Sequence, residues 1–453
     1  MILSRDKAFY HQVFRLTGFI ALQNVIVCFV GLADNVMLGA FSQDALSGVA
    51  LANQVQFLLQ MLIGAVGEGM AVIAAQYWGT SRLQPIRRVV AIALEFALAM
   101  SVLFFAVAQL CPEWLLGLLA NDAAAIAEGA AYMRIVSFSY LFFSATMVLI
   151  SAQRSIENVR VGMISSMTGL LVNIALNWVL IFGNLGAPRL GARGAAIATL
   201  IARMAECGVA LVYTYGINRK LSVAWHDLIH PDQTLLHDFW RIASPVIFSG
   251  ASWGIAQGVQ TSILGHLGSS AIAANAIANS LFQVISVVAY GMSSASAVVI
   301  GKAVGRGDRD HLKGYVNALQ LLYVVIGVLS CAALLACKDA ILTLYAVTPE
   351  AHAMADSFLT VLSITIIGTA YQCSCLTGIV RGGGNTKFVF YNDLIFMWGI
   401  VLPVSLLAAF VWHWNPVLVF FCLKSDQLSK CLVAIWQVNS YHWVRKVTRE
   451  DIG

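Results

Sequence analysis

Residues 38–53, LGAFSQDALSGVALAN, return 226 positions later as LGHLGSSAIAANAIAN at residues 264–279. The leucine, the glycine, three alanines and the final asparagine coincide, and the match extends to Gly79 and Gly305. A second set of matched positions, shifted by 227 residues, pairs Arg154, Asn158 and Arg160 with Arg381, Asn385 and Lys387. Because self-similarity at a fixed spacing is the signature of a repeated architecture, the sequence predicts two similar halves.

The repeats lie in a very apolar chain. Of its 453 residues, 59% are hydrophobic and 11% are charged, whereas a soluble domain carries about 25% charged residues. A helix that crosses a bilayer needs about 20 mostly apolar residues. Twelve such segments are predicted, at residues 14–39, 47–77, 89–111, 130–152, 161–183, 194–217, 242–265, 270–300, 315–337, 353–379, 388–412 and 415–441. The predicted fold class is therefore an all-α integral membrane protein with twelve transmembrane helices.

Twelve helices divide evenly between the halves, which predicts two six-helix bundles. An even number gives both bundles one orientation, so a pseudo-two-fold axis along the membrane normal should relate them. We expect an N-terminal lobe at residues 1–217, a cytoplasmic linker loop at 218–241 and a C-terminal lobe at 242–453. Lys and Arg concentrate at both termini and in alternate loops. Since such residues are retained in cytoplasmic loops, both termini are predicted to be cytoplasmic.

Parallel repeats of this kind are typical of secondary transporters whose substrate site lies between the halves. The small residues at the matched positions also have a simpler interpretation, because they let helices pack closely. The sequence contains no G-x-x-x-x-G-K-[ST] loop that would bind a nucleotide. An ion gradient is therefore the expected energy source.

Several stretches resemble the multidrug and toxic compound extrusion (MATE) family of bacterial transporters. They include GLADNVMLGAFSQDALSGVALANQV (31–55), LVNIALNWVLIFG (171–183), LGARGAAIATLIAR (190–203) and GIVRGGGNTKF (378–388). The resemblance covers nearly the whole chain, and the motifs agree in order and spacing. It implies a two-lobe exporter in the bacterial cytoplasmic (inner) membrane, which expels organic cations or amphiphilic compounds in exchange for protons or sodium ions.

Asp34 lies inside the first predicted helix, where an ionised carboxylate is costly and marks a functional site by default. Burial favours the protonated form of a carboxyl group, so this residue is suited to exchanging a proton for a cation. Asn173 and Asn177 are four residues apart and project from one face of the fifth helix. Thr199 adds a hydroxyl in the sixth. The resemblance implies that these four residues form the cation-coupling site, and their oxygens would be metal ligands if the ion is sodium.

Four further residues are candidates for the substrate cleft: Glu68, Trp253, Met292 and Asp393. Glu68 is either a counter-charge for a cationic substrate or half of a packed pair with an arginine. Trp253 and Met292 either contact flat cationic compounds or are ordinary packing or lipid-facing residues. Asp393 is either solvated or handles substrate or protons, whereas Asp426 is interpreted mainly as part of a neutralised cluster with Lys424 and Lys430.

Other classes of function are weaker alternatives. The +5 net charge is too small and dispersed to indicate nucleic-acid binding, and the nine cysteines lack metal-ligand spacing. No catalytic constellation or cofactor motif is present, so the chain is not expected to be an enzyme. The main alternative is a lipid or lipid-linked oligosaccharide flippase of the same wider superfamily. Small-molecule substrates, the lipid bilayer and a monomeric state are expected. The residues leave both the coupling ion and the substrate open.

Overall fold

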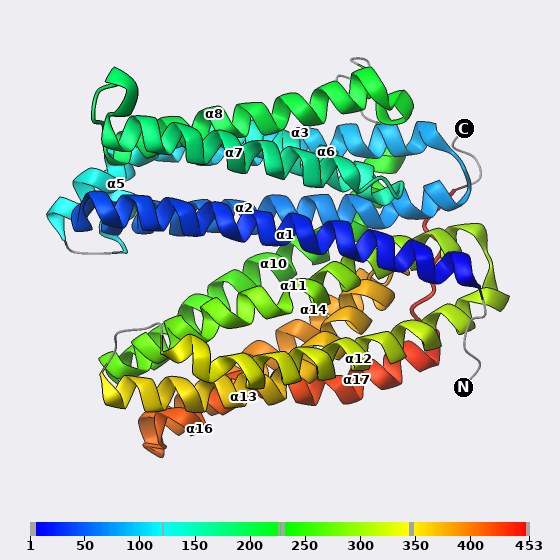
Figure 1. Ribbon diagram of the computed structural model, residues 1–453. Coiled ribbons are helices and arrows are strands. Elements are labelled where there is room, and N and C mark those ends of the chain that lie inside the picture. The colour runs from blue at the N-terminus through cyan, green and yellow to red at the C-terminus, as the bar shows by residue number, and fades with distance from the viewer. Residues whose placement is uncertain (1–5, 120–121, 225–226, 228–231, 344–347, 450–453) are drawn as a thin grey trace. The chain divides into compact units, whose positions relative to one another are not determined.

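In the computed structural model, residues 6–119, 122–224, 227, 232–343 and 348–449 are described, and their regular elements are all helical (Figure 1). The first half of the chain contains α1 (Lys7–Phe41), α2 (Gln43–Gly79), α3 (Leu83–Leu110), α4 (Pro112–Gly117), α5 (Ala123–Val136), α6 (Ser139–Ser155), α7 (Arg160–Phe182), η1 (Asn184–Gly186), α8 (Ala192–Leu211), η2 (Val212–Ile217) and η3 (Arg219–Leu221). The second half contains α10 (Gln233–His266), α11 (Ser269–Arg306), α12 (Arg309–Leu342), α13 (Pro349–Cys373), η4 (Ser374–Val380), α14 (Thr386–Leu394), η5 (Ile395–Val401), α15 (Leu402–Leu406), η6 (Leu407–Val411), α16 (Pro416–Lys424) and α17 (Asp426–Ser440).

Many of these helices are suited to a bilayer. Among the described residues, nine spans are long and apolar enough to cross a membrane, and the bent pair of α5 and α6 makes a tenth. Helices α10 and α16–α17 cover the two remaining predicted segments, 242–265 and 415–441. The protein is therefore a multi-pass membrane protein, and its helices are consistent with the predicted twelve. Of the predicted linker at 218–241, residues 225–226 and 228–231 lie outside the described part.

Two predicted segments are broken rather than straight. The segment predicted at 130–152 is formed by α5 and α6, which meet at a bend of 57°. The segment predicted at 415–441 is divided between α16 and α17, which meet at Ser425. At both junctions a serine hydroxyl donates to a backbone carbonyl, from Ser137 to Arg134 (3.2 Å) and from Ser425 to Cys422 (2.7 Å). Such bonds offer the backbone carbonyl an alternative to the regular helical hydrogen bond. A hydropathy pattern does not reveal them.

The chain forms two compact units that do not follow the halves at every residue. One unit, here called the N-unit, contains Leu22–Ala74 and Ser81–Ala243. The other, the C-unit, contains Ala75–Thr80 and Ser244–Arg449 together with the chain before Leu22. The start of α1 belongs to the C-unit because Phe9 stacks on Tyr315 of α12, with ring centroids 4.2 Å apart.

The matched glycines of the repeat meet inside the C-unit. A Cβ atom added to Gly79 would clash with the Lys302 carbonyl, and one added to Gly305 would clash with the Gln76 carbonyl. The ends of α2 and α11 can approach this closely only because both positions lack a side chain. Gly79 and Gly305 therefore serve close helix packing, which is the simpler interpretation of the matched small residues.

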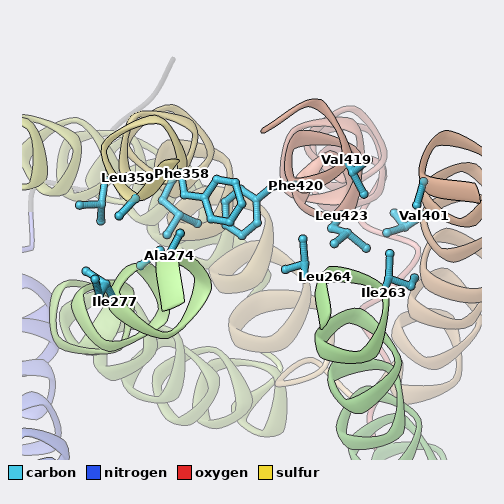
Figure 2. Close-up of a cluster of buried hydrophobic side chains, with 14 of the residues drawn as sticks. Ile263, Leu264, Ala274, Ile277, Phe358, Leu359, Val401, Val419, Phe420 and Leu423 are labelled. Atoms are coloured by element: carbon cyan, nitrogen blue, oxygen red, sulfur yellow. The ribbon is translucent and has the colours of Figure 1, made fainter. Parts of the chain in front are cut away.

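The C-unit also contains an apolar core that positions α10, α13 and α16. Phe358 of α13 stacks on Phe420 of α16, with ring centroids 4.0 Å apart and planes within 4° (Figure 2). Ile263 and Leu264 of α10 belong to the same buried cluster, in which Leu423 is 1% exposed. Interdigitated packing of this kind fixes the relative positions of the helices that carry polar side chains.

Candidate cation site

A carboxylate and an amide from different helices meet inside the N-unit. Asn177 of α7 donates a hydrogen bond from Nδ2 to Oδ1 of Asp34 on α1, over 2.5 Å. Asn177 is fully buried, and Asp34 is partly buried. A polar pair inside a membrane span is costly unless its members satisfy each other, so this contact holds α1 and α7 in register.

The polar chain continues from α7 to α8. Asn177 Nδ2 also donates to Asn173 Oδ1 (3.1 Å), and Asn173 Nδ2 donates to the hydroxyl of Thr199 on α8 (3.4 Å). Asn173 and Thr199 are 1% and 8% exposed. All four residues of the predicted coupling site are therefore brought together by the fold. Whether they bind the coupling ion stays a prediction.

Close packing of α7 against α8 makes this arrangement possible. Gly194 of α8 lies against the backbone of Leu180 on α7, where an added Cβ would approach the Leu180 carbonyl oxygen to 2.5 Å. Gly169 of α7 leaves room for the carboxylate of Glu206 on α8. Small residues at both positions let the two backbones approach, as is common between membrane helices.

Two residues near Asp34 were not assigned to the site from the sequence. The charge of Arg203 on α8 interacts with Asp34, and the buried Tyr132 of α5 lies beside Thr199 and interacts with Asp34. Arg203 also pairs over 2.8 Å with Glu206, three residues further along α8. Tyr132 is a single tyrosine in an alanine-rich helix, so no sequence pattern marked it as a site residue. The Arg203–Glu206 spacing indicated a pair within one helix and gave no sign of Asp34.

The site is chemically a set of hard oxygen atoms around one carboxylate. Within the described residues, Asn177 Oδ1 is buried and accepts no hydrogen bond. That atom and the carboxylate of Asp34 are neutral and anionic acceptors suited to a proton donor or a small alkali cation. No group of three or more His, Cys, Asp and Glu side chains that could hold a metal ion occurs in the described part of the chain.

Of the other predicted cleft residues, Glu68 belongs to the N-unit, and Trp253, Met292 and Asp393 belong to the C-unit. Glu68 on α2 is exposed, and its charge interacts with Arg154 of α6, as expected of a pair with an arginine. Trp253 on α10 is 41% exposed. Met292 on α11 is fully buried, and its sulfur accepts a hydrogen bond from Thr17 over 3.3 Å. Met292 therefore has no surface in this conformation that a substrate could contact.

Asp393 forms an ion pair rather than standing alone. Its Oδ1 lies 3.0 Å from the ammonium of Lys430 on α17, which lies 3.3 Å from Asp426 Oδ2. Asp426 and Lys430 therefore pair across one turn of α17, within the cluster predicted for Asp426. Lys424 donates to Oε1 of Gln260 over 3.3 Å, and Gln260 is the repeat counterpart of Asp34. At these positions the two units therefore differ in chemistry: one has an acid and the other an amide held by a lysine.

Comparisons with known proteins agree with this architecture. The MatE family model matches residues 20–179 and 245–407. The uncharacterized transporter YisQ of Bacillus subtilis is 23% identical, covering 97% of this chain and 96% of its own length. A probable multidrug resistance protein, NorM, of Thermotoga maritima is 25% identical over 95% of this chain and 92% of its own. The crystal structure of a mutant of the Vibrio cholerae MATE transporter VcmN superposes with a TM-score of 0.88 at 16% identity, covering 97% of this chain and 98% of that one.

Proposed function

This chain belongs to the MatE family, the multidrug and toxic compound extrusion transporters, and we propose that it is a secondary active multidrug exporter. It expels organic cations or other amphiphilic compounds in exchange for protons or sodium ions. The observation that carries the proposal is the hydrogen bond between Asp34 and Asn177, which places an ionisable group among buried amides inside a membrane-spanning bundle. The names of relatives such as NorM support the substrate class.

Ion binding at Asp34 supplies the coupling. A proton or sodium ion neutralises the carboxylate, and the buried Asn177 Oδ1 is an acceptor that stays open for it. If the ion binds one conformation more tightly and the substrate binds another, each must weaken the binding of the other by the same factor. Two lobes, residues 1–217 and 242–453, then alternate between outward-facing and inward-facing states. The transporter works as a monomer in a bacterial inner membrane.

The test is ethidium efflux from proteoliposomes that contain the purified protein. A pH gradient and a sodium gradient are imposed in separate runs, and we expect efflux driven by only one of them. Such a result identifies the coupling ion. Absence of efflux under either gradient, with folded protein, contradicts the proposal and favours a flippase of the same superfamily, which a headgroup-translocation assay on the same vesicles then examines.

The matched variants are Asp34→Asn and Asp339→Asn, the second at an exposed position near the end of α12. Asp34→Asn removes the group that carries the ion, so gradient-driven efflux should fall to the level of empty vesicles. Asp339→Asn should retain the wild-type rate. Both proteins should insert in the membrane in equal amounts, and full efflux by Asp34→Asn at wild-type levels would refute the role of this carboxylate.

A further inference from the structure

A single ammonium group is shared between two carboxylates in the C-unit. Lys430 of α17 lies 3.0 Å from Asp393 Oδ1 on α14 and 3.3 Å from Asp426 Oδ2 on its own helix. The side chains of Lys430 and Asp426 are 6% and 2% exposed, whereas that of Asp393 is 32% exposed. Only one member of the network can therefore be approached from outside the bundle.

Asp426 is a fixed partner for the lysine. Both of its carboxylate oxygens accept from Gln427 Nε2 at 3.0 Å. Gln427 Oε1 in turn accepts from Gln372 (2.8 Å) and Thr369 (3.1 Å) of α13. Removing the only partner of a buried charge is strongly destabilising. Lys430 avoids that cost if it leaves Asp393, because Asp426 still holds it.

Asp393 is oriented from the opposite side. Ser249 of α10 donates a hydrogen bond from its hydroxyl to Asp393 Oδ2 over 2.9 Å, which leaves Oδ1 to Lys430. Trp253, 41% exposed, is one helical turn further along the same face of α10. Trp398, 38% exposed, donates its indole N–H to Ser252 over 2.7 Å, so it also lies against α10. Trp253 lies on the stretch of α10 that contacts Asp393, and Trp398 is bonded to the same stretch.

The partial exposure of Asp393 indicates what surrounds its carboxylate within a membrane span. Ionisable side chains within such spans almost always face the bundle interior or a water-filled cavity, because lipid offers them no partner. Asp393 is therefore reached from water. A cation that arrives there meets a carboxylate already aligned by Ser249. The same stretch of α10 carries Trp253, and an indole ring can attract positive charge.

The sequence repeat identifies the residue of the first half that corresponds to Lys430. The shift of 227 residues places Thr199 on Asp426 and Arg203 on Lys430. In the N-unit, Arg203 pairs with Glu206 on its own helix, whereas Lys430 reaches across to α14. The guanidinium of arginine forms rigid forked pairs, but lysine is a point charge on a flexible stem. At this repeat position, the arginine of one unit is ion-paired within its own helix, and the lysine of the other unit is ion-paired both within its own helix and with α14.

We propose that Asp393 binds the protonated amine of a cationic substrate, and that Lys430 is a tethered counter-ion. The substrate displaces the ammonium of Lys430 from Asp393 Oδ1, and Lys430 stays paired with Asp426. The proposal rests on the proposed export of organic cations and names the part of the substrate that is recognised. The ligand must carry at least one N–H group, since it replaces an N–H···O bond.

The charge balance restricts the ligand further. Lys424, which donates to Gln260 and interacts with Asp426, and Lys430 together balance the charges of Asp393 and Asp426. A bound substrate adds its own charge to this neutral set. Because uncompensated charge inside a membrane protein is costly, monovalent amines should bind more tightly than divalent ones.

The test compares monodansylcadaverine, a fluorescent primary amine, with its trimethylammonium analogue. Dissociation constants are measured by fluorescence anisotropy on purified protein in detergent at one fixed pH. Asp393→Asn should weaken binding of the primary amine about ten-fold or more, the effect of losing a hydrogen bond to a charged group. The same change should affect the analogue less, because that compound has no N–H to donate.

The decisive variant combines Asp426→Asn with Lys430→Gln, which removes the tethered competitor and leaves the net charge unchanged. Binding of the primary amine should become several-fold tighter. A merely structural ion pair predicts instead that this double variant binds no better than the wild type, and that result would overturn the inference. Unchanged binding by Asp393→Asn would also overturn it, and thermal unfolding of each variant excludes misfolding as the cause.

Gradient-driven efflux of the same primary amine separates this inference from the proposed function. If the wild-type protein exports the amine but neither variant changes the affinity for it, only the role of Asp393 and Lys430 is contradicted. A wild-type protein that exports no cation under either gradient contradicts the proposed function itself. If the wild-type protein exports the amine, and if Asp393→Asn weakens its binding while the double variant tightens it, both the inference and the proposed function are supported.

Discussion

At the scale of single residues, Asn177 joins two members of the candidate site. Its amide nitrogen donates to both Asp34 and Asn173. A similar asparagine pair occurs on α11, where Asn279 Nδ2 donates to Asn275 Oδ1 at the same distance of 3.1 Å. Among the described residues, this second pair makes no hydrogen bond to a carboxylate, so it separates the effect of an asparagine pair from the effect of holding an acid.

We expect Asn177→Leu to reduce gradient-driven efflux about ten-fold or more at a limiting gradient, because a hydrogen bond to a charged group is worth about 1.5–3 kcal/mol. Asn279→Leu should retain efflux within about two-fold, since a typical neutral hydrogen bond contributes about 1 kcal/mol and no ion is involved. Equal losses in both variants would show that the asparagine pairs serve packing alone. The measurement is the initial rate of ethidium efflux per inserted protein.

At the scale of helices, two glycines on α8 differ sharply in their surroundings. A Cβ on Gly194 would press on the Leu180 backbone of α7, whereas nothing lies within 4 Å of a Cβ on Gly208. Because Asn173 is on α7 and Thr199 on α8, separation of these helices would also lengthen the 3.4 Å bond between them. Packing and the candidate site therefore depend on the same contact.

Gly194→Ala should destabilise the protein by about 1–3 kcal/mol, the usual effect of overpacking, and should lower efflux as well. Gly208→Ala on the same helix should be neutral or stabilise it by up to about 1 kcal/mol, because alanine is the better helix former. Thermal unfolding in detergent, followed with a thiol-reactive dye on the chain's nine free cysteines, reports the difference. Similar melting temperatures for the two variants would contradict the packing argument.

At the scale of the whole molecule, the distribution of Lys and Arg predicts the direction of insertion. These residues concentrate in alternate loops and at both ends of the chain, and the positive charges are retained in the cytoplasm. The orientation is still a prediction, and residues 1–5 and 450–453 lie outside the described part. Reporter fusions can determine it without further structural work.

Fusions after Gly453 should give fluorescent GFP and inactive alkaline phosphatase, because the C-terminus is predicted to be cytoplasmic. Fusions to a chain truncated after Thr343, at the end of α12, should give the opposite result, since this loop is predicted to be outside. Active phosphatase at Gly453 would reverse the orientation and with it the side from which substrate enters.

The sequence by itself determined the membrane class, the positions of the twelve apolar segments and the family. These properties are local, because the length of an apolar run and the spacing of a repeat can be counted along one chain. The pairs within one helix, Arg203 with Glu206 and Asp426 with Lys430, were predictable for the same reason. Helical spacing places residues three or four positions apart on one face.

Only the tertiary structure decided what meets across helices. It joins Asp34 to Asn177, places Arg203 near Asp34, buries Met292 and pairs Lys430 with Asp393. None of these contacts is encoded in spacing, because residues far apart in sequence meet only where packing brings their helices together. Glycines such as Gly194 and Gly305, which admit a neighbouring backbone, help to set those positions. The chemistry of both candidate sites therefore follows from the packing of the helices.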